Sequence, residues 1–240
     1  MTDSLNPPDR TEIDRNAKVV SELNNLIQII AGTSSIIENI WEGRPGSEKY
    51  FAMLRASIER AEQVTAQLVV EAGGTDQKIK LRPDVQQGHD RASKTPPVPD
   101  GKKYSVLVVD DEPMALTLLQ RVLIEGGYEV AVAQSGFECL DLFRRGRHRH
   151  DLVLLDLAMP LMDGEETFQR LRHMSATANV VLMAGFIDTA RLEQMMKDGL
   201  SGFLGKPFAP EEILAVVASV ITSRQASQAK PASNGIAAAV

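Results

Sequence analysis

The chain has 240 residues, which is enough for one large domain or two small ones. Its net charge of −6 argues against general nucleic-acid binding, because a phosphate backbone would repel an acidic protein. The single cysteine, Cys139, excludes an intrachain disulfide, and no apolar run approaches the roughly 20 residues that span a bilayer. The first residues also lack the apolar core of a signal peptide. These features predict a cytoplasmic protein that binds neither nucleic acid nor membrane.

The first third of the sequence predicts two amphipathic helices. Residues 1–10 are polar and are expected to be disordered, and a helix can begin at Thr11, which has the spacing of a capping box with Asp14. Glycine and proline at 43–46 end this helix, and the second helix ends at Gly73. Both helices repeat apolar or small side chains at heptad spacing: Val19, Leu23, Leu26, Ile30, Thr33, Ile37 and Ile40, then Phe51, Leu54, Ile58, Ala61, Thr65 and Leu68. The pattern predicts an antiparallel hairpin over residues 11–72.

The apolar face of this hairpin is too wide for two helices to bury between themselves. Val20, Ile27, Ile29 and Ile36 broaden it beyond a narrow stripe. The simplest way to cover it is self-association of two chains into a dimeric four-helix bundle. Packing of the hairpin against the C-terminal part of the same chain is the alternative.

Composition changes again after the hairpin. Residues 73–103 are rich in Gly, Pro, Asp, Lys and Gln and predict a flexible linker. From 104 to 223 short apolar runs alternate with amphipathic segments, and the tail at 224–240 is expected to be disordered. Five strands alternating with five helices predict an α/β fold with a doubly wound, parallel five-stranded sheet. The expected strands are 104–109, 128–133, 152–155, 180–183 and 202–204, and the expected helices are 113–125, 136–144, 164–173, 188–198 and 209–222.

Charged residues follow several of these strands. Asp110 and Asp111 come after the first strand, Asp156 after the third and Lys206 after the fifth. The carboxyl ends of parallel strands form the ligand-binding edge of such a sheet, so these side chains should converge. Three close carboxylates repel one another unless a cation lies among them, and oxygen ligands favour Mg²⁺. One carboxylate could then act as a nucleophile toward a phosphoryl group, with Lys206 contacting the phosphoryl oxygens.

Three motifs at these strand ends resemble the receiver domain of bacterial response regulators, which has a flavodoxin-like fold. They are VLVVDDEP (106–113), LLDLAMPLMDG (154–164) and GFLGKPF (202–208). The resemblance implies that Asp156 is the phosphoacceptor and that Asp110 and Asp111 hold Mg²⁺ together with Asp156 and the carbonyl of Ala158. It also implies that Lys206 contacts the phosphoryl group and precedes a cis proline.

Ala184 departs from the receiver pattern. Receivers carry Ser or Thr at this position, whose hydroxyl hydrogen-bonds the phosphoryl group when the domain switches, and alanine has no hydroxyl. Phe203 occupies the position of the switch aromatic residue. We therefore expect phosphorylation to persist and the coupling of phosphate to the output face to be weakened or altered.

The hairpin is similar to the dimerisation hairpin of hybrid histidine kinases. The segment SELNNLIQIIAG (21–32) matches the phosphoacceptor helix, but Ser21 stands where the histidine is expected. Serine is a poor phosphoryl acceptor without an activating base, so histidine relay through this hairpin is not expected. Glu22 and Asn25 keep the acidic and amide positions, so that Ser21, Glu22 and Asn25 form a candidate phosphatase surface. A solvated polar turn is the alternative.

These features predict a phosphoacceptor signalling protein rather than an enzyme, with no kinase domain and no DNA-binding output domain. Its expected partners are a histidine kinase or a histidine phosphotransfer protein and a second copy of itself. Signalling would occur through protein contacts. The alternatives are a phosphatase or phosphate sink acting on another receiver, and a scaffold that works without phosphate.

Overall fold

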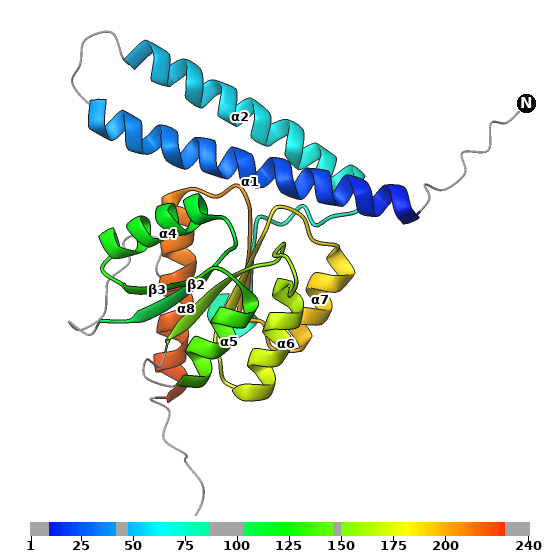
Figure 1. Cartoon of the computed structure of the whole chain (residues 1–240), viewed down its shortest axis with the longest axis vertical. Helices are drawn as coiled ribbons and strands as arrows, with labels where there is room; N and C mark the ends of the chain where they lie inside the picture. The colour runs from blue at the N-terminus through cyan, green and yellow to red at the C-terminus, as the bar shows by residue number, and fades with distance from the viewer. Residues whose placement is uncertain (1–9, 42–47, 87–102, 146–149, 229–240) are drawn as a thin grey trace, which may run out of the picture.

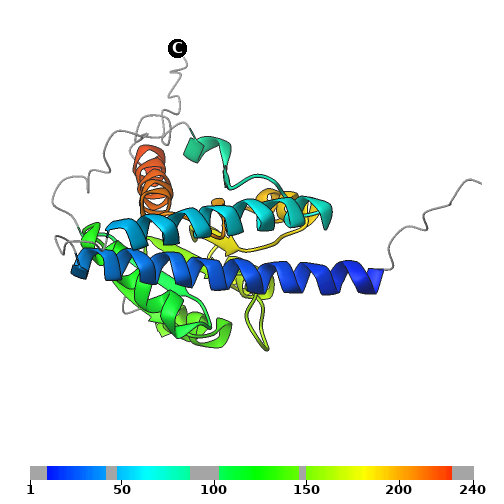
Figure 2. The same ribbon diagram turned by 90° about the horizontal axis from the view of Figure 1, so that it is seen from above.

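A helical hairpin lies across one end of an α/β domain in the computed structural model of the protein (Figure 1). The structure describes residues 10–41, 48–86, 103–145 and 150–228. The hairpin consists of α1 (Arg10–Trp41) and α2 (Glu48–Glu71), which lie side by side when seen from above (Figure 2). Helix α1 begins one residue earlier than expected, and the predicted break at 43–46 falls outside the described residues.

A six-stranded sheet forms the centre of the α/β domain. Its strand order is β1-β6-β5-β4-β2-β3, and all neighbours are parallel except β1 and β6. The flavodoxin-like order β6-β5-β4-β2-β3 confirms the predicted α/β class with a mostly parallel sheet. The strands are β1 (Ile79–Leu81), β2 (Ser105–Val109), β3 (Glu129–Ala133), β4 (Leu152–Asp156), β5 (Val180–Ala184) and β6 (Gly202–Gly205).

The extra strand β1 comes from the segment expected to be a flexible linker. It pairs antiparallel with β6, placing Ile79 opposite Leu204 and Leu81 opposite Gly202. Leu81 and Val85 are buried in the core, which explains why this part of the chain is held in place. The linker prediction was therefore wrong for residues 73–86, and its remainder at 87–102 lies outside the described residues.

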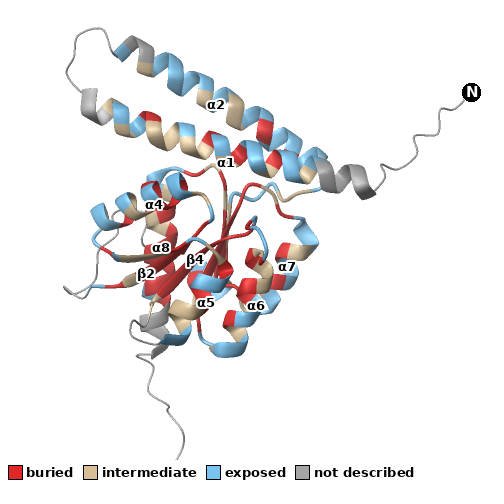
Figure 3. Cartoon of the chain, in the orientation of Figure 1, coloured by how far each residue is buried: buried red, intermediate tan, exposed pale blue. Residues whose placement is uncertain are grey.

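Helices cover both faces of the sheet. Helices α4 (Pro113–Glu125) and α8 (Pro210–Gln228) pack on one face, and α5 (Gly136–Arg145), α6 (Gly164–Met174) and α7 (Thr189–Lys197) pack on the other. Side chains of β2 alternate between the two faces: Val106 and Val108 pack in the core beneath α4 and α8. Leu107 and Val109 pack in the core beneath α5, α6 and α7. Buried residues accordingly concentrate along the strands and the inner faces of the helices (Figure 3).

Both ends of the sequence were expected to be disordered. Helix α8 continues to Gln228, so the disordered tail predicted from residue 224 was wrong for 224–228, whose residues are compatible with a helix anchored by Val220 and Ile221. The segments 1–9 and 229–240, also expected to be disordered, lie outside the described residues. No helix in the described part of the chain is long and apolar enough to cross a bilayer.

Candidate functional site

Asp156 is the last residue of β4, and its Oδ1 lies 2.7 Å from Nζ of Lys206. Its side chain is buried, and its Oδ2 accepts a hydrogen bond of 2.9 Å from the backbone N–H of Ala158. The chain then turns back so that Gly164 N donates to Leu157 O. A Cβ on Gly164 would lie 2.3 Å from the carbonyl oxygen of Asp156, so the turn after β4 requires glycine there.

Asp110 and Asp111 follow β2, the strand beside β4. Carboxylate oxygens of Asp110, Asp111 and Asp156 all lie within 4.8 Å of one another. Oδ1 of Asp110 accepts a hydrogen bond from the backbone of Glu112, which orients this carboxylate. Asp110 and Asp156 are buried, whereas Asp111 is exposed at the rim. This set of oxygen donors, with one carboxylate open to solvent, fits a hard divalent cation such as Mg²⁺.

Lys206 is the counter-charge of this acidic group. Its Nζ lies 2.8 Å from Oδ2 of Asp110 and 2.7 Å from Oδ1 of Asp156, and all three side chains are at most 2% exposed. The backbone N–H of Lys206 donates to the carbonyl of Ala184, which fixes the position of Lys206 beside the end of β5. The Lys206–Pro207 bond is cis, as expected. A buried cation held by two carboxylates can also contact an oxyanion delivered to the same point.

Burial and like charge shift the pKa values in this group. Burial raises the pKa of Asp156, the charge of Lys206 opposes that shift, and the charge of Asp110 adds to it. Burial raises the pKa of Asp111 as well, and the neighbouring charge of Asp110 raises it further. Burial alone would lower the pKa of Lys206, but the charges of Asp156 and Asp110 raise it overall. Lys206 therefore stays protonated while the carboxylates remain crowded with negative charge.

The two expected switch residues lie beside this group. Ala184 ends β5, is buried, and offers no side-chain donor above Lys206. Phe203 in β6 is only 2% exposed and packs in the core layer of α5, α6 and α7. Its backbone lies opposite Lys80 of β1, so the edge strand runs directly alongside the switch aromatic residue.

The three candidate phosphatase residues lie on α1 and are half-buried or exposed, whereas Asp110, Asp156 and Lys206 are buried. Ser21 is half-buried against the loop that follows β5, because a Cβ on Gly185 would lie 2.8 Å from Ser21 O. Glu22 is exposed. Asn25 is half-buried, and its Oδ1 accepts no hydrogen bond from the described residues. Ser21 therefore contacts the loop after β5.

Sequence reasoning missed two residues of α1 that bind the sheet edge. Nδ2 of Asn24 donates a 2.6 Å hydrogen bond to Gly185 O, and Gln28 bonds to the backbone of Phe208. Asn24 lies one position after the heptad residue Leu23, so it belongs to a neighbouring stripe with Val20 and Ile27. This second stripe at heptad spacing indicates that α1 has a second packing face. It does not indicate which surface of the protein that face contacts.

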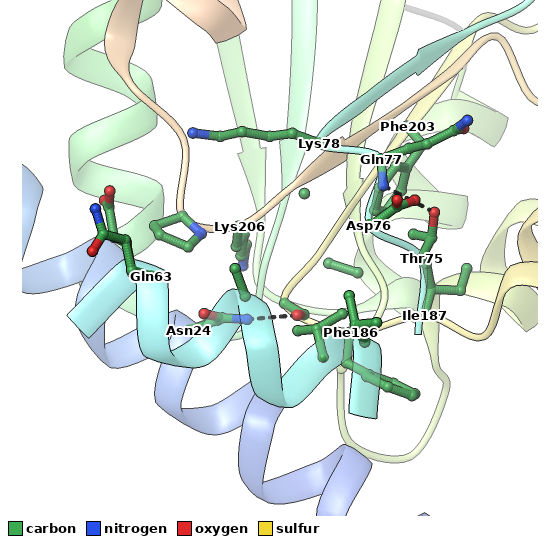
Figure 4. A pocket seen from close by; sticks show the side chains of 18 of the residues that line it. Asn24, Gln63, Thr75, Asp76, Gln77, Lys78, Phe186, Ile187, Phe203 and Lys206 are labelled. Carbon is green, nitrogen blue, oxygen red and sulfur yellow. Dashed lines mark hydrogen bonds between the residues drawn. The ribbon is translucent and has the colours of Figure 1, made fainter. Parts of the chain in front are cut away.

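A cavity of about 450 Å³ lies between the hairpin and the sheet edge. Its walls include Asn24 from α1, Val69 from α2, Phe186 from the loop after β5, and Phe203 and Lys206 from β6 and the loop beyond it. Figure 4 shows Asn24, Phe186 and Lys206 around this space, with the amide of Asn24 bonded to the loop carbonyl. Lys206 of the charged group thus borders a space that the hairpin helps to enclose.

Comparison with known proteins gives consistent results for the α/β domain. Residues 106–218 match the response regulator receiver domain family. The chain is 28% identical to the chemotaxis protein CheY of Halobacterium salinarum over 119 residues, which is 49% of this chain and 97% of that protein. It is 36% identical over 110 residues to the response regulator MprA of a Mycobacterium species, covering 46% of this chain and 47% of that protein.

The chain thus spans about half the length of MprA. A receiver domain protein from Clostridium thermocellum is similar in structure, with a TM-score of 0.49, 25% identity, and coverage of 52% of this chain and 98% of that one. The family match covers the strands that carry Asp110, Asp156 and Lys206. Residues 106–218 therefore form a response regulator receiver domain.

Proposed function

We propose that this protein is a phosphoacceptor in a two-component phosphorelay, in which Asp156 takes a phosphoryl group from a histidine kinase or a histidine phosphotransfer protein. The observation that carries the proposal is the buried group at the sheet edge. Lys206 lies within 2.8 Å of both Asp110 and Asp156, and oxygens of three carboxylates lie within 4.8 Å of one another. The receiver family of residues 106–218 favours the same chemistry.

The chain's own residues perform distinct parts of this reaction. A carboxylate oxygen of Asp156 forms a bond to phosphorus, the bond between phosphorus and the donor atom breaks, and the donor leaves with that electron pair. The attacking form of Asp156 is the carboxylate, which carries no proton that the transfer would have to remove. The hydrogen bond from Ala158 N holds one carboxylate oxygen, and Lys206 places positive charge beside the other.

Mg²⁺ would be held by Asp110, Asp111 and Asp156, and when bound it supplies positive charge against the incoming phosphoryl oxygens. The exposed side chain of Asp111 gives the ion a route from solvent. The carbonyl of Ala158, implied as a further ligand, lies on an exposed residue next to Asp156. All of these donors are oxygens, as Mg²⁺ requires.

The test is incubation of the purified protein with acetyl phosphate. We expect one phosphoryl group to be added in the presence of Mg²⁺ and little or none after treatment with EDTA, as measured by intact mass. Mapping of the acyl phosphate by borohydride reduction should identify Asp156. Modification that is unaffected by EDTA, or that maps to another carboxylate, would contradict the proposal.

We further propose that the hairpin pairs with the hairpin of a second copy to form a four-helix bundle. One face of α1 packs on the receiver, yet most of the described apolar residues of the predicted seam on α1 stay in solvent. Val19, Leu26 and Ile30 are each at least 50% exposed, and Leu68 of α2 is also exposed. Exposed apolar side chains at heptad spacing over several turns are typical of a helix–helix interface.

Substitution within this seam tests the dimer. Leu26→Glu places a charge where the second hairpin would pack, so it should convert the dimer to a monomer in sedimentation equilibrium. The matched control is Asn16→Glu, which adds the same charge at an exposed polar position of α1 and should leave the dimer intact. A wild-type protein that is already monomeric at micromolar concentration would rule out this bundle.

A further inference from the structure

Helix α1 binds three elements of the receiver that surround Asp156 and Lys206. These are α4, the loop 185–188 after β5 and the loop 206–209 after β6, which together we call the access surface. Gln28 of α1 forms two hydrogen bonds with the backbone of Phe208, which lies in the loop 206–209. Its Nε2 donates to Phe208 O at 3.1 Å, and its Oε1 accepts from Phe208 N at 2.6 Å. A side chain that pairs with a donor and an acceptor of one residue fixes the register of α1 on the receiver.

The loop after β5 is shaped for a close approach of α1. Asn24 is 2% exposed and donates to Gly185 O at 2.6 Å. A Cβ on Gly185 would lie 2.8 Å from Cβ of Asn24 and 2.8 Å from Ser21 O, distances that real Cβ atoms do not tolerate against backbone. The contact therefore depends on glycine directly after Ala184, the residue beside the catalytic group.

The third contact joins α1 to α4. A Cβ on Gly32 would lie 2.7 Å from Cδ1 of Leu118, so the two helices meet without a gap. Four residues at heptad spacing on this face of α1 are buried, namely Val20, Asn24, Ile27 and Ser34. The docked stripe is thus separate from the exposed seam, and α1 can use one face for the receiver while the other remains free.

The connection between hairpin and receiver keeps this contact within one chain. Gly74 forms a bridge with Asp188, and Thr75 N donates to Ile187 O at 3.0 Å. Both anchors hold the end of α2 to the loop that contains Gly185. A tether this short gives the hairpin a high effective concentration at the access surface.

The hairpin helps to enclose two cavities beside Lys206. Lys206 lines the cavity of about 450 Å³ described above and a second cavity of about 670 Å³ that is bounded by Gln28 and Gly32 of α1 and by α4. Asp156 is 1% exposed. Asp111 and Ala158 are exposed, so two of the expected metal ligands are open to solvent, whereas Lys206 borders two cavities that α1 helps to enclose.

We propose that the access surface is a binding site for the chain's own α1, and that a phosphodonor reaches Asp156 only in the fraction of molecules in which α1 has left it. This inference rests on the proposed phosphoacceptor function and adds its regulation. The apparent rate of phosphorylation is then the rate of the open form multiplied by its population. A partner that binds the docked stripe of α1, which is accessible only in the open form, would raise that population and thereby speed phosphoryl transfer.

An engineered disulfide between α1 and α4 tests the proposal. A Cβ at position 32 would lie 3.4 Å from Cγ of Leu118, the place that a cysteine sulfur would take, so Gly32→Cys with Leu118→Cys can close a bond. The native Cys139 is buried, and burial raises its pKa to about 12, so it does not compete. The probe is phosphoramidate with Mg²⁺, followed by intact mass, with Mg²⁺ affinity measured by calorimetry.

We expect the oxidised protein to be phosphorylated at least about tenfold more slowly than the same protein after dithiothreitol, with unchanged Mg²⁺ affinity. Equal rates in the two forms, or failure of the folded double variant to form the disulfide, would overturn the inference. Absence of phosphorylation in both forms would instead refute the phosphoacceptor function.

A second pair of variants removes the contact without cysteines. Asn24→Ala and Gln28→Ala each delete hydrogen bonds to the access surface, so each should be phosphorylated several-fold faster than the wild type. The matched controls are Asn16→Ala, exposed on the same helix, and Gln67→Ala, whose side chain bonds to Glu71 within α2. Rates of the test variants that equal those of the controls would show that α1 does not limit access.

Discussion

Replacement of Lys206 by Met is expected to lower the free energy of unfolding by about 3–5 kcal/mol in metal-free buffer. The ammonium group lies 2.8 Å from Asp110 and 2.7 Å from Asp156, and none of the three side chains is more than 2% exposed. Methionine fills the volume of the lysine stem but leaves two buried carboxylates without a counter-charge. The loss should be measured by urea unfolding, and added Mg²⁺ should recover part of it.

The control for this prediction is Lys78→Met. Lys78 pairs with Glu212 at 3.1 Å, but its side chain is 49% exposed, so its loss should cost at most about 1 kcal/mol. If the two variants unfolded at the same urea concentration, the buried ion pair would not be the source of stability that the geometry suggests.

Replacement of Asp156 by Asn is expected to abolish acyl phosphate formation while leaving the fold at least as stable as the wild type. The amide has no nucleophilic oxygen anion, so phosphorylation by acetyl phosphate should fall below detection in intact mass. It also removes one of three crowded negative charges, while Asp110 and Lys206 keep their pair at 2.8 Å. Thermal unfolding without metal should therefore show no decrease in Tm.

The pH dependence of stability gives a second readout for the same variant. Burial raises the pKa of Asp156 in the folded protein above its unfolded value, so the folded state binds the proton more tightly. Stability of the metal-free wild type should accordingly fall as pH rises through these two pKa values, and Asp156→Asn should lose that contribution. The surface variant Asp141→Asn should keep both phosphorylation and the pH dependence, and phosphorylation that survives in Asp156→Asn would overturn the assignment of the acceptor.

The receiver fold could be predicted from the sequence because its signals are local. The strands at 152–156 and 180–184 are continuous apolar runs followed by turn residues, and each observed boundary lies within one or two residues of the predicted one. The convergence of Asp110, Asp156 and Lys206 followed from the rule that parallel strands place their carboxyl ends at one edge. For these residues, local pattern and global topology agree.

The remaining features depend on contacts that no local pattern specifies. Strand β1 has only three residues, too few to show an alternation, and its pairing with β6 is a long-range event. The docking of α1 depends on side chains such as Asn24 and Gln28, which are ordinary polar residues in an isolated helix. The hydrogen bonds of Asn24 and Gln28 to the receiver confirm the alternative of packing within the chain, while the four-helix bundle stays a prediction.

The pairing of β1 with β6 has a consequence for how the protein can be divided. Residues 79–86 supply Leu81 and Val85 to the interior, and the main chain of Lys78 accepts a hydrogen bond of 2.7 Å from Gly205. A fragment beginning at residue 103 would bare the outer rim of the sheet and lose two apolar side chains from the layer beneath α8. A fragment cut at the start of the receiver match would thus expose β6 as an unpaired edge strand and be prone to aggregation, whereas a fragment that begins before residue 72 would keep β1 paired with β6.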